Sequence, residues 1–161
     1  MRTDRRLHSH RDVMARIKGL KKAIAAIRKF DADAEKAAKE ELLKIGQEIL
    51  ADALRRVPVD SGVLRASLDI EQQNNGWRVV VYADAPHAPF QEFGTGRKAG
   101  ELVRGYPADV GDYAYTFYVS GKGNTTPQPF LFPAFLAVRE QVVARVEEVL
   151  RKHAAEFNRL K

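Results

Sequence analysis

The sequence predicts a single α+β domain in which an antiparallel β-sheet of three to five strands packs against long N-terminal and C-terminal helices. Apolar residues recur at three- and four-residue steps near both ends of the chain, which is typical of amphipathic helices. Between them, two strand-like segments flank the turn Asn74-Asn75-Gly76, which favours a β-hairpin. The 161 residues suit one hydrophobic core, and neither a repeat nor a linker divides them.

The N-terminal part is predicted to form two helices, one over residues 13–27 and one that reaches about residue 57. Their apolar stripes are Val13, Ile17, Leu20, Ile24 and Ile27 in the first and Leu42, Ile45, Ile49 and Ala53 in the second. Asp31 or Asp33 can cap the second helix, and Pro58 ends it because the residue before a proline avoids helical geometry. The pattern leaves open whether the two helices are continuous or bent near residue 31.

A short helix and a hairpin are expected next. Asp60 or Ser61 can cap a helix from Val63 to about Ser67. Residues 68–73 and 77–83 then form two antiparallel strands, because Asn and Gly tolerate the positive φ of a tight turn. Residues 90–93 form one further turn before a Gly-Thr-Gly segment.

Residues 97–126 are predicted to be an extended loop and strand insertion. Within it, Tyr113, Tyr115 and Phe117 alternate with Ala114 and Thr116 as in a strand. The proline-rich residues 127–133 then lead into a last helix that reaches about residue 158. Its apolar stripe is Phe135, Val138, Val142, Val146, Val149 and Leu150.

The formal net charge of +6 is concentrated in the first 30 residues, which balance at +8, whereas the remaining 131 residues balance at −2. Residues 1–12 are therefore predicted to be a mobile basic arm on a nearly neutral body. The side chains that could contact DNA or an acidic partner are Arg16, Lys18, Lys21, Lys22, Arg28 and Lys29. A solvated helix face is the simpler explanation of the same charges.

Composition disfavours membrane-spanning proteins and removes thiol chemistry. No apolar run approaches the ~20 residues of a membrane span, and no signal peptide is expected. Because the chain has no cysteine, disulfides, thiol catalysis and thiolate metal sites are excluded. Its four histidines have no convergent ligands, so no metal and no cofactor are predicted.

The candidate catalytic patterns are better explained by structure, so no catalytic residue is predicted. Gly94-Thr95-Gly96-Arg97 lacks the spacing of a phosphate-binding loop, and Asp60-Ser61 lacks a placed histidine. Glu92, between Phe90 and Phe93, is expected in a buried ion pair or as a cap rather than as a general acid.

Three ordered segments, residues 57–68, 82–96 and 128–134, resemble the neck or minor tail-component family of tailed double-stranded DNA bacteriophages. The resemblance spans about residues 13–155 and says least about residues 97–126, which are longer than in many relatives. It implies a structural virion protein, found in the host cytoplasm during assembly, that joins head and tail or completes the tail. It also implies that copies of the chain form a ring, most simply of six. This ring would contact adjacent neck or head-completion proteins and tail-tube or tail-terminator proteins. DNA would pass through this ring without being specifically bound.

Two sets of residues follow from this resemblance. The structural motif residues are Pro58, Asp60, Ser61, Gly62, Leu64, Arg65, Pro129, Phe130 and Pro133. The candidate interface residues are Phe93, Gly94, Thr95, Gly96, Arg97, Tyr106, Tyr113, Tyr115, Phe117 and Tyr118. An equal alternative is that the aromatic residues of 97–126 complete the subunit's own sheet. The alternative function is a nucleic-acid-binding module that uses the basic arm.

Overall fold

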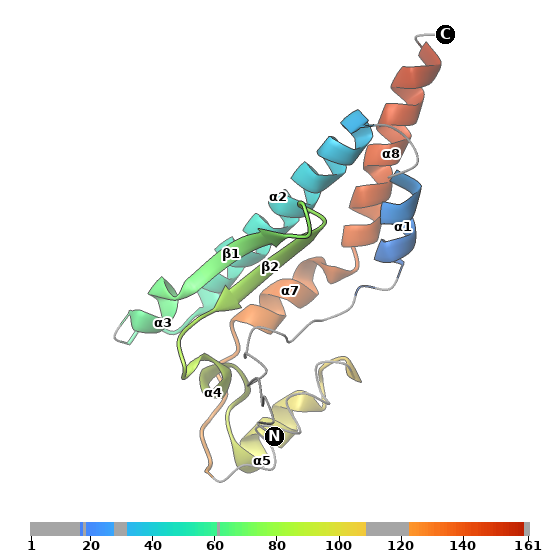
Figure 1. The fold of residues 1–161 in the computed structure, drawn as a ribbon. Coiled ribbons are helices and arrows are strands. Elements are labelled where there is room, and N and C mark those ends of the chain that lie inside the picture. The colour runs from blue at the N-terminus through green and yellow to red at the C-terminus, as the bar shows by residue number, and fades with distance from the viewer. Residues whose placement is uncertain (1–16, 18, 28–31, 61, 109–122, 160–161) are drawn as a thin grey trace, which may run out of the picture. The chain divides into compact units, whose positions relative to one another are not determined.

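The computed structural model describes residues 17, 19–27, 32–60, 62–108 and 123–159, and its internal contacts divide the chain into two compact units. The helix–hairpin unit comprises residues 17–88 and 128–161, and the insertion unit comprises residues 1–16 and 89–127. The predicted single domain stays a prediction. Figure 1 shows the elements of both units.

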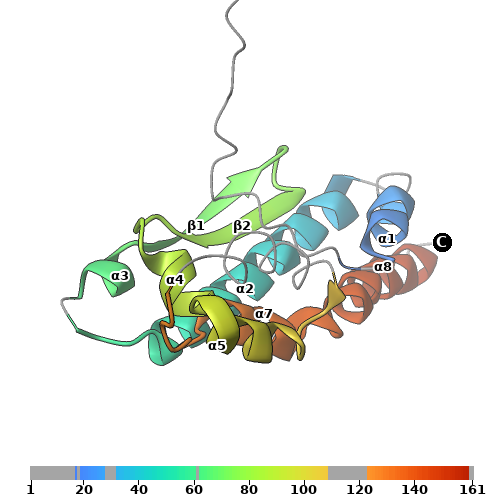
Figure 2. The same cartoon turned by 90° about the horizontal axis from the view of Figure 1, so that it is seen from below.

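The helix–hairpin unit is organised around one long helix, α2 (Ala32–Arg56). The hairpin of β1 (Leu68–Gln73) and β2 (Arg78–Ala83) contacts this helix, and so do α7 (Leu131–Arg139) and α8 (Val142–Arg159). The short α1 (Leu20–Ile27) lies along α8 (Figures 1 and 2). The core therefore collects the predicted stripe of α2 together with residues from α1, α7, α8 and the hairpin.

Gly46 lets the hairpin approach α2 closely. A Cβ atom at this position would lie 2.8 Å from Cδ1 of Ile70 and would overlap the side chain of Val79. Ile70 is on β1 and Val79 on β2, so both strands meet the helix at this glycine. At the turn end, Nζ of Lys39 on α2 lies 5.4 Å from the ring centroid of Trp77, within the range of a cation–π contact.

The hairpin confirms the predicted strands and turn. Its antiparallel register runs from Leu68 opposite Ala83 to Gln73 opposite Arg78. Asn74 and Asn75 have φ values of 51° and 53°, so the connection uses the left-handed conformations that its residue types favour. Within the described residues the sheet has two strands, and three to five strands are not confirmed. The strand predicted near Tyr113 lies outside the described residues.

Several predicted helix boundaries differ from the structure. The last helix is two helices, because Gln141 N–H donates to the Val138 carbonyl at 2.9 Å and a tight turn separates α7 from α8. The short helix α3 (Val63–Ala66) begins after Gly62, whose φ is 78°, with no side-chain cap. Asp60 is therefore not its cap, and Ser61 lies outside the described residues. Asp33 lies inside the first turn of α2 rather than before it, and Asp31 is not described.

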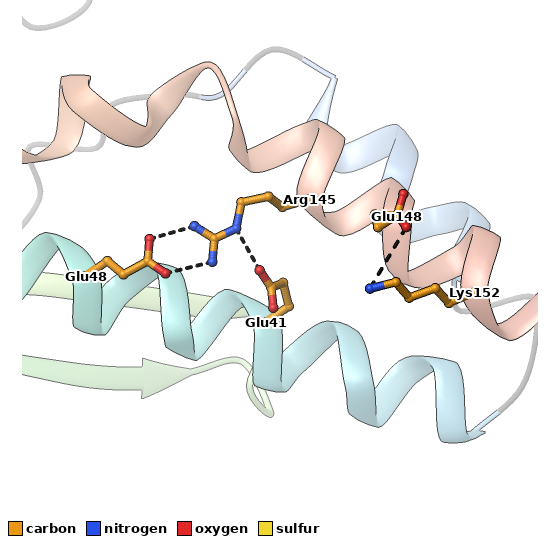
Figure 3. A network of polar contacts seen from close by, with 5 residues as sticks. All are labelled: Glu41, Glu48, Arg145, Glu148 and Lys152. Carbon is orange, nitrogen blue, oxygen red and sulfur yellow. Dashed lines mark hydrogen bonds and ion pairs between the residues drawn. The ribbon is translucent and has the colours of Figure 1, made fainter.

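Arg145 joins α8 to α2 (Figure 3). Its Nε donates to Glu41 Oε1 at 2.7 Å, and its two terminal nitrogens donate to the two carboxylate oxygens of Glu48 at 2.6 and 2.8 Å. This bidentate contact lowers the pKa of Glu48 and raises that of Arg145. The network fixes the rotation of α8 against α2 at the middle of the unit.

Candidate subunit interface

The Gly94-Thr95-Gly96 segment closes the base of the insertion by binding residues 123–127. Thr95 N–H donates to the Thr125 carbonyl at 3.1 Å, and Thr125 N–H donates to Thr95 Oγ1 at 2.8 Å. Lys98 Nζ adds a hydrogen bond to Thr126 Oγ1 at 2.6 Å. We refer to residues 94–96 and 123–127 together as the base clamp.

Both glycines of the base clamp are required by geometry. Gly94 has a φ of 69°, and a Cβ there would lie 2.5 Å from the Thr125 carbonyl oxygen. Gly96 has a φ of 61°, and a Cβ there would overlap the Gly123 carbonyl oxygen. An L side chain at either position would be strained and would separate the two strands of chain. The first and last residues of the insertion are thus held side by side.

The insertion unit surrounds the clamp with two helices, α4 (Ala88–Phe93), whose first residue belongs to the other unit, and α5 (Gly96–Val103). Phe93 is buried and meets Tyr106 edge to face, with ring centroids 6.4 Å apart. Burial of the Tyr106 hydroxyl, and secondarily the charge of the buried Glu92, raises the pKa of Tyr106. The predicted turn at residues 90–93 is confirmed as α4.

The predicted interface residues fall into three groups. Phe93, Gly94 and Thr95 are buried within the chain, and Gly96 and Tyr106 are half-buried. Arg97 is exposed over 79% of its side chain and pairs with Glu101 on α5 at 3.3 Å. The remaining predicted residues of the insertion, Tyr113, Tyr115, Phe117 and Tyr118, lie outside the described residues. Among the described positions, Arg97 on the outer face of α5 is therefore the predicted interface residue that is accessible to a partner.

The structural motif residues lie around α3 and at the start of α7. Leu64 is buried and Arg65 is exposed on α3, next to the exposed Val59 and Val63. At the other motif, Phe130 is almost completely buried at the N-cap of α7. Pro129 precedes it, and Pro133 lies in the first turn of α7, where its missing N–H is not needed by the helix.

Only part of the predicted basic surface can be placed. Lys21 and Lys22 are exposed on α1, whereas Arg16, Lys18, Arg28 and Lys29 are outside the described residues. Among the described residues there is no group of three or more side chains suited to hold a metal ion, and no helix long and apolar enough to cross a membrane.

Sequence reasoning missed the hydrogen bonds of the base clamp. Thr95 was predicted as an interface residue, yet its hydroxyl and amide bind a segment thirty positions away. Thr125 and Lys98 were not singled out. The sequence does indicate such a contact, because a threonine between two glycines suits a close approach of two backbone segments. It does not identify the segment that Thr95 binds.

Residues 21–94 match the family HK97-gp10_like, described as Bacteriophage HK97-gp10, putative tail-component. This match confirms the predicted resemblance to a phage neck or tail-component family, and the description names no enzyme class. It covers just under half of the chain and ends at Gly94, where the base clamp begins. No curated protein and no solved structure matches the chain.

Proposed function

We propose that this chain is a structural protein of a tailed phage particle that forms an oligomeric ring at the neck and joins head and tail or completes the tail. The observation that carries this proposal is the match of residues 21–94 to a phage tail-component family. Six copies would suit the six-fold axis of such tails. The ring would contact head-completion or neck proteins on one side and tail-tube or tail-terminator proteins on the other, and DNA would pass through it without specific binding.

A closed ring needs two different patches on each copy, because every subunit meets the next one head to tail. Each unit of this chain offers exposed surface of a distinct kind. The helix–hairpin unit exposes Val59 and Val63, over 63% and 56% of their surfaces. The insertion unit exposes the charged face of α5, including Arg97 and Glu101. These surfaces support the assembly role without requiring any reaction.

The proposal is tested by native mass spectrometry and electron microscopy of the purified protein, alone and with tail tubes. We expect rings that persist at micromolar concentration or form on the tube. Arg97→Glu should reduce assembly or tube binding several-fold. Arg55→Glu is a matched control, because Arg55 is exposed over 72% of its side chain and also pairs within its own helix. Monomers under both conditions, or equal effects of the two substitutions, would contradict the proposal.

A nucleic-acid-binding module is the second candidate, favoured by the exposure of Lys21 and Lys22 on α1. DNA affinity that falls steeply as salt rises, and that disappears in the double variant Lys21→Glu/Lys22→Glu, would support it. The ring proposal expects the opposite behaviour, in which this double variant still assembles and the unmodified protein shows no salt-steep DNA affinity.

A further inference from the structure

A groove of about 450 Å³ lies between α3 and the end of the hairpin where the chain enters β1 and leaves β2. Asp84 N–H donates to the Ser67 carbonyl at 3.0 Å, which ties the two strands together at this end. The groove is lined by apolar surface from Val63, Ala66 and Leu68 and by the polar residues Asp69, Tyr82 and Asp84. All of these residues belong to the helix–hairpin unit.

The groove combines exposed apolar surface with a negative charge. Val63, on its α3 wall, is more than half exposed. Asp69 and Asp84 contribute two exposed carboxylates to its lining. A ligand for this groove would therefore carry both apolar and cationic side chains, since each type of surface favours its complement.

The N-terminal segment of the chain has this composition. Residues 1–16 contain five arginines against two aspartates, together with the apolar Leu7, Val13 and Met14. Sixteen residues of extended chain span about 50 Å, which is enough to cross to an adjacent subunit. We infer that residues 1–16 of one copy bind the groove of a neighbouring copy. This inference rests on the proposed assembly of copies and assigns the basic arm to a protein partner.

The contact would work through charge-assisted hydrogen bonds between arginine guanidinium groups and the carboxylates of Asp69 and Asp84. Apolar side chains such as Leu7 would cover the exposed Val63. Because the carboxylates lie at an open groove, salt screens the charge contribution, and the contact weakens as ionic strength rises. Binding of each N-terminal segment to the next copy would then strengthen a ring without requiring a larger interface between the bodies of the subunits.

Cysteine cross-linking of the full chain tests this contact directly, because the natural sequence contains no cysteine. A Ser9→Cys variant is mixed with an Ala66→Cys variant, so that a cross-link between the two positions can form only between copies. A short bis-maleimide reagent is added, and the linked peptides are identified by mass spectrometry. Ala155→Cys is the matched control, because Ala155 is an exposed helical alanine and α8 lies at the opposite end of the unit from α3 (Figures 1 and 2).

We expect the Ser9–Ala66 product to exceed the Ser9–Ala155 product several-fold and to fall as salt is raised. The double substitution Asp69→Asn/Asp84→Asn should reduce it several-fold. Glu71→Gln should not, because Glu71 is an exposed carboxylate on the same strand that does not line the groove. Equal yields at Ala66 and Ala155, or equal effects of Asp69→Asn/Asp84→Asn and Glu71→Gln, would overturn the inference.

A second pair of variants tests the apolar part of the contact. Val63→Ser should lower the Ser9–Ala66 yield, whereas Val59→Ser should not, because Val59 is equally exposed but does not line the groove. Circular dichroism checks that both variants fold. Native mass spectrometry of the same mixtures separates the two proposals: rings without the cross-link overturn the arm contact alone, and cross-linked pairs without rings overturn the ring alone.

Discussion

Thr95 and Thr125 form two reciprocal hydrogen bonds across the base of the insertion. The backbone amide of Thr95 donates to the Thr125 carbonyl, and the backbone amide of Thr125 donates to the Thr95 hydroxyl. The pair closes a segment of almost thirty residues. Closing such a segment costs chain entropy, which the two hydrogen bonds and the close backbone contacts at Gly94 and Gly96 offset.

Thr95→Val should loosen the insertion. The substitution keeps the shape of the side chain but removes the oxygen that accepts from Thr125, so the local free energy of opening should fall by about 1–2 kcal/mol. Limited proteolysis should then cut within residues 97–126 several-fold faster. Thr126→Val is the control, because its hydroxyl accepts a hydrogen bond from the exposed Lys98 amine and not from the backbone of the base clamp. Equal cleavage rates for the two variants would show that Thr95 does not hold the base.

Gly46→Ala should destabilise the helix–hairpin unit although alanine is the better helix former. The added Cβ meets the side chains of Val79 and Ile70, and such overpacking costs about 1–3 kcal/mol of unfolding free energy. Urea denaturation measures the loss. Gln47→Ala, on the exposed side of the same helix, should change stability by less than about 0.5 kcal/mol.

A double variant makes the Gly46 prediction specific. Val79→Ala removes the nearer of the two side chains that the new methyl group meets, so Gly46→Ala should cost less in the Val79→Ala background than in the natural chain. If the free-energy costs of Gly46→Ala and Val79→Ala simply add, the contact with Val79 is not the source of the strain at residue 46.

Arg145→Met should lower the unfolding free energy by about 1–2 kcal/mol at neutral pH, because it leaves the carboxylates of Glu41 and Glu48 without this partner. Arg145→Lys should recover part of the loss, since it keeps the charge but not the bidentate geometry.

The same contact has a pH signature. The pKa of Glu48 lies below its ordinary value of 4.5 in the folded chain, chiefly because Arg145 donates hydrogen bonds to it. A depressed carboxyl pKa contributes stability above the unfolded value, and this contribution disappears as the pH falls through the folded pKa. The stability difference between the natural chain and Arg145→Met should therefore shrink below about pH 4.5. A difference that stays constant from pH 7 to pH 3 would contradict the assignment.

The turn of the hairpin offers a fourth test. Asn75 has a φ of 53°, so Asn75→Val should cost about 1–2 kcal/mol because a branched side chain disfavours left-handed geometry. Asn75→Gly should be tolerated at nearly full stability. Thermal unfolding of the two variants checks the contrast, and equal melting temperatures would contradict it.

The parts of the fold that were predicted correctly depend on neighbours in the sequence. The hairpin follows from strand alternation around two asparagines and a glycine, and the body of α2 follows from the spacing of Leu42, Ile45 and Ile49. The break between α7 and α8 could not be predicted in this way. Neither glycine nor proline interrupts residues 138–142, and the apolar stripe continues across the turn, so tertiary packing sets its position.

The Gly-Thr-Gly segment shows the same limit, and its place in a subunit interface stays a prediction. Its residue types indicate a close backbone approach, but its hydrogen-bond partners lie thirty positions away, and sequence spacing alone does not pair them. Likewise, residue type favours Asp60 as a cap of α3, whereas the backbone of Gly62 begins the helix in a left-handed conformation. Local preferences identify which residues are unusual, and long-range contacts decide what they do.

The central place of α2 has a consequence for how the helix–hairpin unit unfolds. The hairpin, α1, α7 and α8 all contact this one helix, so none of its buried turns can open while its neighbours remain in place. Amides near Ile45 and Ile49 should therefore exchange with solvent only through global opening of the unit, whereas α3 and the ends of α8 exchange through smaller fluctuations. The amide protons that exchange most slowly in this unit should therefore lie in α2, the twenty-five-residue helix on which the other elements pack.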